Sequence, residues 1–133
     1  MVGLVALLAS LYAATAAHLA LTQFPAPCQG YNAFGFANIA RGGSANVVAN
    51  VILQGATPSA TCGVRLIQVG PGVSDCGSFT GPFQHELTTD ALGNGNLNIN
   101  EAVIANAKQA FIALNNVDLT RPNDYYNTPL TDI

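Results

Sequence analysis

Charged side chains are scarce in this sequence of 133 residues, making up 8% of the chain, whereas 50% of the residues are hydrophobic. A typical soluble domain carries about 25% charged residues, and so few charges would give a cytosolic protein poor solubility. The polar residues are mainly Asn, Gln, Ser, Thr and Gly, a balance that is common in secreted β-domains, extracellular walls and fibres. The composition therefore predicts an extracellular or cell-surface protein.

Basic residues are especially few, and the formal net charge is −3. The cations are scattered along the chain, at Arg41, Arg65, Lys108 and Arg121. Isolated cations cannot form the basic stripe that follows a phosphate backbone, so no nucleic-acid partner is expected. A polybasic patch for anionic lipid is also missing. A membrane contact is therefore expected only through the apolar N-terminal segment.

Three cysteines occur, at Cys28, Cys62 and Cys76. In an oxidising compartment two of them would pair, and three single bridges are open. The separation of 14 residues favours Cys62–Cys76, a bridge that would stabilise the fold by about 3 kcal/mol. Cys28 would then be a free thiol or a crosslink to a neighbouring chain. No Cys/His spacing typical of zinc is present, and the sequence predicts no metal and no cofactor.

Residues 1–22 contain no charged side chain and predict an apolar helix. One interpretation is a secretory signal peptide, because Ala14-Thr15-Ala16 gives an A-x-A cleavage pattern. The other is a retained helix, since about 20 residues span roughly 30 Å, enough to cross a bilayer or line a fibre core. Residues 23–30 contain Pro25 and Pro27, which predict the end of the helix and a linker.

Residues 31–133 show the signals of an all-β domain. From Val47 to Leu53 every second residue is apolar and suited to a core face, which is the period of a strand. Asn94-Gly95 predicts a hairpin turn, and the Pro-interrupted segment 125–133 predicts an edge strand. About six or seven strands separated by turns indicate a β-sandwich. A helix over residues 101–114 is the alternative, because that stretch is rich in alanine.

Two turn patterns carry a resemblance to a known class of domain. The turn Gly55–Pro58 precedes the strand-like run Cys62–Gln68, and Leu87–Leu97 contains a T-D-A-x-G-N-G hairpin. Over residues 31–115 these patterns resemble secreted bacterial immunoglobulin-like β-domains of uncharacterised function. The resemblance implies an immunoglobulin-like β-sandwich preceded by the apolar helix, and it implies no chemistry.

The layout of the chain, an apolar N-terminal segment followed by a β-domain, is also similar in outline to pilin subunits. Pilins of this layout carry the apolar helix in the filament core and the globular domain outside. The resemblance implies self-association through an apolar surface of the helix, formed by Leu4, Leu7, Leu8 and Leu11.

The stretch from Asp90 to Glu101 matches part of a calcium-binding EF-hand loop. Asp90, Asn94 and Glu101 occupy positions 1, 5 and 12 of that loop, and Gly95 occupies position 6. Leu92 stands at position 3, where it cannot ligate a metal. An Asn-Gly hairpin is therefore the ordinary interpretation, and a weak calcium site is the alternative.

Candidate catalytic residues do not form a recognisable set. His85 alternates with Phe83 and Leu87, which predicts a place on a sheet face with a hydrogen-bond partner. No G-x-S-x-G motif is present, and the only glutamates are Glu86 and Glu101. The sequence predicts no catalytic residues and therefore no enzyme. Asn96, Asn98 and Asn100 share one strand face, which is either solvated, or binds glycan, or pairs with a neighbouring subunit.

The leading hypothesis is an extracellular structural or adhesive subunit that assembles through its N-terminal helix, as a pilin-like filament protein does. Its partners would be copies of itself or another cell-surface protein. The alternatives are a freely secreted binding module for a glycan, small ligand or protein, and a secreted enzyme inhibitor with residues 70–78 as its reactive loop.

Overall fold

The computed structural model describes residues 16–23, 33–42, 45–73, 83–121 and 124–133, which form nine strands and no helix. The strands are β1 (Ala17–Gln23), β2 (Ala33–Gly42), β3 (Asn46–Leu53), β4 (Thr61–Val69), β5 (His85–Thr88), β6 (Gly95–Ala102), β7 (Gln109–Asn116), β8 (Tyr125–Asn127) and β9 (Thr131–Asp132). The all-β character predicted from the sequence is confirmed.

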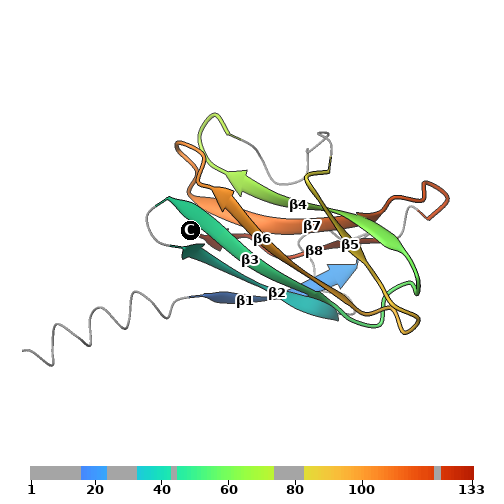
Figure 1. The fold of residues 1–133 in the computed structure, drawn as a ribbon. Helices are drawn as coiled ribbons and strands as arrows, with labels where there is room; N and C mark the ends of the chain where they lie inside the picture. Colours follow the sequence, from blue (N-terminus) through green and yellow to red (C-terminus); the bar gives the residue numbers. More distant parts are fainter. Residues whose placement is uncertain (1–15, 24–32, 43–44, 74–82, 122–123) are drawn as a thin grey trace, which may run out of the picture.

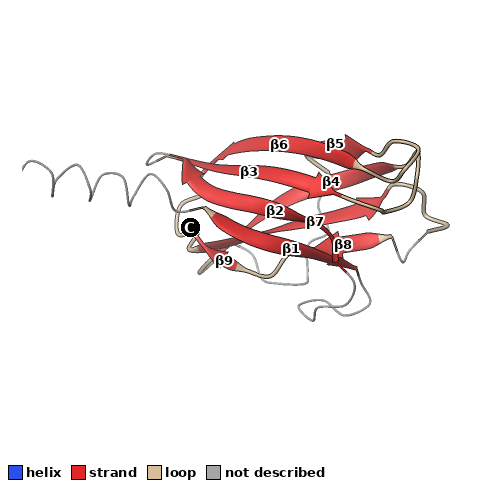
Figure 2. Cartoon of the chain, turned by 90° about the horizontal axis from the view of Figure 1, so that it is seen from below, coloured by secondary structure: helices blue, strands red, loops and turns tan. Residues whose placement is uncertain are grey.

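A single antiparallel sheet contains all of these strands, in the order β5-β4-β7-β8-β1-β2-β3-β6, with β9 attached to β7. The sheet curls until its two end strands, β5 and β6, come together, and the result is a nearly closed eight-stranded barrel (Figures 1 and 2). Closing a sheet into a barrel removes the exposed edges along which strands of other chains could pair.

The core fills the inside of the barrel. Burial in β3 alternates along the strand, so that Val47, Ala49, Val51 and Leu53 point inward. They meet inward side chains from the other strands, and burying this apolar surface drives folding. Members with 2% exposure or less include Leu21, Ala37, Ile39, Val64, Leu87, Ala110, Ile112, Leu114 and Tyr126.

A second, smaller apolar cluster lies on the outside of the barrel. Ile67 of β4 and Phe111 and Ala113 of β7 are buried there, with Val69, Tyr125 and Leu130 packed against them. Strands β4 and β7 are therefore buried on both faces, and β7 reads as a continuous buried run from Ala110 to Leu114.

The predicted β-sandwich is wrong, and β1 is the physical reason. This strand pairs with β2 on one side and with β8 on the other, which joins the strands into one sheet and leaves no pair of separate sheets. The predicted helix over residues 1–22 is wrong for residues 17–22, which belong to β1. There Leu19 and Leu21 face inward while His18 and Ala20 are exposed, an alternation that suits a strand.

The structure also differs from the expectations for residues 125–133 and 101–114. The predicted edge strand over residues 125–133 is wrong for β8, which lies between β7 and β1 and ends before Pro129, so proline removes no donor from it. It holds for β9, which pairs only with β7 among the described strands. The alternative helix over residues 101–114 is also wrong, since this stretch contains the end of β6 and most of β7. Residues 1–15, with Leu4, Leu7, Leu8 and Leu11, and linker residues 24–30 lie outside the described part of the chain.

Candidate functional site

The outer side of β1, β2, β3 and β6 carries a row of polar side chains at one height of the barrel. The register of these strands places His18 opposite Asn38, Asn38 opposite Asn50, and Asn50 opposite Asn98. Each of these residues points outward because its neighbours in sequence point into the core. The row therefore follows directly from strand alternation together with the antiparallel register.

Hydrogen bonds between side chains hold the members of this row in place. The Nδ1 atom of His18 lies 2.7 Å from Oδ1 of Asn38, and Asn50 donates from Nδ2 to Oδ1 of Asn98 over 2.6 Å. Farther along the same two strands, Asn46 donates from Nδ2 to Oδ1 of Asn100 over 2.6 Å, in a diagonal pair rather than a directly opposite one. We call the surface formed by His18, Asn38, Asn46, Asn50, Asn98 and Asn100 the amide face.

A hollow of about 440 Å³ opens on the amide face. Its walls include Asn38, Asn50, Asn98 and Asn100, and between them lie the half-buried side chains of Ala40 and Val48. None of its described lining residues carries a charge. Next to the row, the rings of His18 and Phe36 stack at a tilt with centroids 4.5 Å apart. The hollow thus combines neutral donors and acceptors with a small apolar floor.

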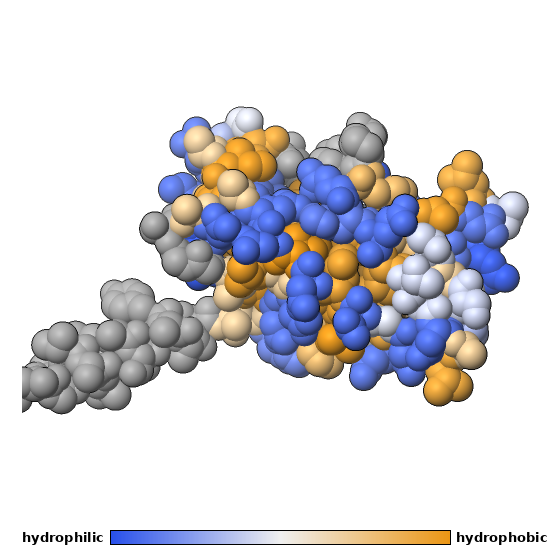
Figure 3. Space-filling view, in the orientation of Figure 1, coloured by the Kyte–Doolittle hydropathy of each residue, from blue (hydrophilic) through white to orange (hydrophobic). Residues whose placement is uncertain are grey.

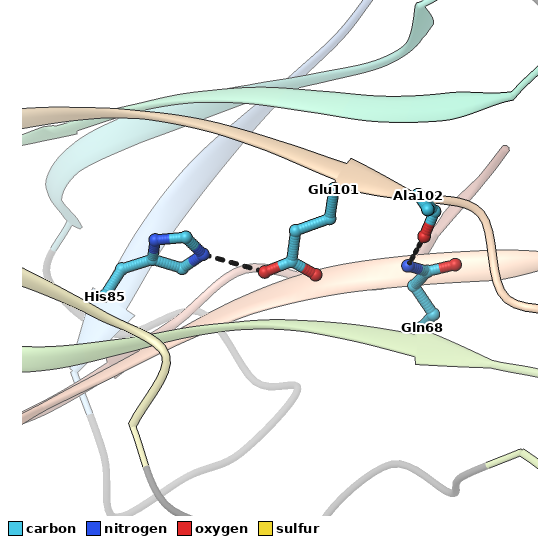
Figure 4. Close-up of polar contacts among 4 residues, drawn as sticks. All are labelled: Gln68, His85, Glu101 and Ala102. Carbon is cyan, nitrogen blue, oxygen red and sulfur yellow. Dashed lines mark hydrogen bonds and ion pairs between the residues drawn. The ribbon is translucent and has the colours of Figure 1, made fainter.

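A second group of polar side chains lies where β5 and β6 meet and the barrel closes. We call this junction, with His85, Glu101 and Gln68, the seam. Strand β5 pairs with residues 61–64 of β4. Along the seam, His85 of β5 reaches Glu101 of β6, with Nε2 and Oε1 2.8 Å apart (Figure 4). The space-filling view from this side shows hydrophilic side chains with apolar surface between them (Figure 3).

Gln68 of β4 bridges the same seam farther along. Its Nε2 donates to the carbonyl of Ala102 over 2.9 Å (Figure 4), and its Oε1 accepts from the backbone N–H of Ile104 over 2.8 Å. The side chain is 3% exposed. A buried amide that satisfies two backbone groups acts as a substitute for strand pairing, so the contacts of Gln68 are structural.

The structure separates the residues of the predicted calcium loop. Asp90 accepts backbone hydrogen bonds from Leu92 and Asn94 at 2.8 and 3.0 Å, which forms a tight turn, and these bonds lower the pKa of its carboxyl group. Asn94 Oδ1 accepts from the backbone of Gly55 over 2.9 Å. Glu101 lies at the far end of β6 and contacts His85. Asp90 and Asn94 therefore lie together in the turn, apart from Glu101.

Cys62 is a free, buried cysteine on the inner side of β4. Burial, and secondarily the negative charge of Asp124, raise the pKa of its thiol to about 11. A thiol of this kind is protonated at neutral pH and unreactive. Because Cys62 is free, the predicted Cys62–Cys76 bond is not formed in this structure; Cys76 itself lies outside the described residues. Most of the proposed inhibitor loop, residues 74–78, is also outside them.

Asp124 anchors a polar cluster near Cys62. Thr57 and Asn116 both donate hydrogen bonds to its Oδ2 atom, the latter over 3.1 Å. Burial, followed by the charge of Asp124, raises the pKa of Tyr126 to about 12. These groups tie the β3–β4 and β7–β8 loops together at one end of the barrel.

Within the described ranges, no group of three or more His, Cys, Asp or Glu side chains is arranged to hold a metal ion. The same part of the chain contains no helix long and apolar enough to cross a membrane. Comparison with family models, curated proteins and solved structures finds no match. The resemblances to immunoglobulin-like domains and to pilins thus gain no support beyond the antiparallel all-β character.

Sequence reasoning identified one side of the amide face and missed the other. The row Asn96, Asn98 and Asn100 was visible as every second residue of one strand. Asn50 and Asn38 precede Asn98 by 48 and 60 residues and align with it only through the register of β2, β3 and β6. The available signal was that both asparagines interrupt otherwise apolar strand patterns.

Proposed function

We propose that this protein is an extracellular structural or adhesive subunit, displayed at the cell surface, that contacts its partner through the amide face. The observation that carries the proposal is the hydrogen-bonded row of Asn50 with Asn98 and Asn46 with Asn100 beside an uncharged hollow. Side chains held by one another lose little further entropy when a partner binds, which favours recognition by a preorganised surface.

The composition supports an extracellular setting for this role, because a low charge content suits walls and fibres better than the cytosol. In the proposal, the apolar sequence that precedes the barrel, with Leu4, Leu7, Leu8 and Leu11, drives assembly of copies into a filament or envelope layer. The barrel is then the part presented to the outside, and its amide face is the part that adheres.

The test combines electron microscopy of native material, its N-terminal mass and a retention assay on envelopes of the producing cells. We expect regular polymers or a protein retained on the envelope, with residues 1–15 present in the mature chain. The double variant Asn50→Asp/Asn98→Asp puts two charges on the amide face and should reduce retention at least tenfold. Asn96→Asp, on the same side of β6 but outside the lining of the hollow, is the matched control.

A chain that begins near Ala17, sediments as a monomer and does not stay on envelopes would refute this function. The second candidate is a freely secreted binding module, which the size of the hollow favours, since ligand pockets typically enclose about 300–1,000 Å³. For that function we expect a soluble monomer whose melting temperature rises with a ligand, because a ligand that binds only the folded state stabilises it.

A further inference from the structure

We propose that the hollow on the amide face binds a neutral carbohydrate chain. This inference rests on the proposed function only in taking the amide face as the contact surface; the identity of the ligand is argued from the chemistry of the hollow itself.

The absence of charge around the hollow selects against ionic ligands. Phosphates and carboxylates are recognised by Arg, Lys or helix N-termini, and cations by carboxylates. The described residues that line the hollow include none of these side chains, and they belong to strands. An uncharged polar ligand therefore fits the site better than an anion or a cation.

The amide groups are suited to hydroxyl groups in particular. An asparagine amide both donates and accepts hydrogen bonds, and so does a hydroxyl. The bond from Asn50 to Asn98 uses one hydrogen of the Asn50 amide and one acceptor position of the Asn98 oxygen, so both residues keep further hydrogen-bonding capacity. Asn38 likewise carries two amide hydrogens beside its contact with His18.

The spacing of the row suits an extended ligand. Asn38, Asn50 and Asn98 stand on three adjacent strands. Since neighbouring strands lie about 4.8 Å apart, the row from Asn38 to Asn98 is roughly 10 Å long, which is longer than a single sugar ring. A chain of sugars lying across the strands can therefore meet successive amides.

The apolar floor supplies the second half of carbohydrate chemistry. Sugar rings present C–H groups on their faces and hydroxyls around their edges. Ala40 and Val48 offer small apolar surface between the asparagines, and the half-buried ring of Phe36, packed against His18, extends it along the sheet. The arrangement places apolar contact beneath the ring faces and amides beside their edges.

The test titrates the full chain with cellohexaose, maltohexaose and chitohexaose, and with oligogalacturonate as an anionic counterpart. We expect at least one neutral oligosaccharide to bind and to shift the NMR signals of the Asn50 and Asn98 side-chain amides. Asn50→Ala and Asn98→Ala should each weaken that binding about tenfold, as the loss of a ligand hydrogen bond does. The matched control Asn96→Ala should stay within about twofold of the unchanged chain.

Several results would overturn the carbohydrate proposal. These are no binding of any neutral oligosaccharide at millimolar concentration, equally tight binding of oligogalacturonate, an equal loss in Asn96→Ala, and an Asn98-dependent dimer without sugar. If sugars fail while Asn50→Asp/Asn98→Asp still abolishes envelope retention, only the ligand class is wrong. If sugars bind while retention is unaffected, the adhesive function is wrong and the binding site remains.

Discussion

The outward side chains of β4 and β7 and those of β2, β3 and β6 stand on the same continuous sheet but meet different surroundings. Ile67 and Phe111 lie opposite one another on β4 and β7 and are each 3% exposed. Asn50 and Asn98 lie opposite one another on β3 and β6 and are accessible to solvent. We refer to the two regions as the apolar half and the amide half of the barrel wall.

The apolar half is built as a sheet with material on both sides. Leu130 and Tyr125 pack on its outer cluster, and the Phe83 ring lies over Gly63 and stacks with the Arg65 guanidinium at 4.3 Å from the ring centroid. The amide half has a core on one side only. The outer face of the apolar half is therefore buried and contributes to stability, whereas the outer face of the amide half remains accessible to solvent.

The largest expected effect is the loss of Phe111 in the apolar half. Phe111→Ala removes a buried ring and leaves a cavity, so we expect unfolding free energy to fall by about 3–5 kcal/mol. Denaturant unfolding followed by far-UV circular dichroism measures it. The matched variant Phe36→Ala, on the outer side of the amide half and only half-buried, should cost about half as much or less. Equal losses of unfolding free energy in Phe111→Ala and Phe36→Ala would mean that the outer faces of the two halves contribute equally to stability.

Next in size is the loss of the seam amide where the two halves close. Gln68→Ala leaves the Ala102 carbonyl and the Ile104 N–H without their partner, and we expect a loss of about 1–3 kcal/mol. Gln109→Ala is the control, since that amide bonds to Asp132 on the exposed surface and its loss should stay within about 0.5 kcal/mol. Equal effects in the two glutamine variants would mean that the seam does not contribute to closure.

Local patterns in the sequence predicted much of the amide half. Alternation along Val47–Leu53 and along Asn96–Asn100 gave both the strands and their outward faces, and the structure has them as β3 and β6. Barrel closure could not be predicted in the same way, because β1 must pair not only with β2, the next strand in the chain, but also with β8 near the C-terminus. Residues 17–22 are apolar enough for a helix, and only the alternation of His18, Leu19, Ala20 and Leu21 favoured a strand.

The candidate site shows the same limit. The Asn96–Asn100 row was identified because all its members lie on one strand. The residues that complete it, His18, Asn38 and Asn50, come from three other strands, and their alignment is set by long-range register. The EF-hand spacing of Asp90, Asn94 and Glu101 assumed one compact loop, whereas an extended strand carries Glu101 away from the turn.

Alkaline pH should lower the stability of the fold by ionising two buried groups, the thiol of Cys62 and the hydroxyl of Tyr126. The folded-state pKa of Cys62 is raised from 9.0 to about 11, and that of Tyr126 from 10.0 to about 12, so the folded chain holds these protons more tightly than the unfolded chain. The stabilisation that Cys62 contributes is complete below pH 9 and is lost as pH rises from about 9 to 11. By pH 10 the loss amounts to about 1 kcal/mol.

Urea unfolding at pH 8 and pH 10 measures this fall, and Cys62→Ala provides the comparison. The variant has no thiol to ionise, so most of the fall between the two pH values should disappear even though the variant is less stable at both. An unchanged pH dependence in Cys62→Ala would show that the alkaline loss arises elsewhere, and the apolar half would no longer account for it.

In the amide half, the loss of Asn98 should change the stability of the fold least. Asn98→Ala removes the acceptor for Asn50 on an exposed surface, and since water replaces such a partner, unfolding free energy should change by no more than about 0.5 kcal/mol. The same variant is expected to lose about tenfold in sugar binding. If Asn98→Ala instead destabilised the chain by about 2 kcal/mol or more, the amide row would be a structural brace, because only a residue on which folding depends carries so large a loss.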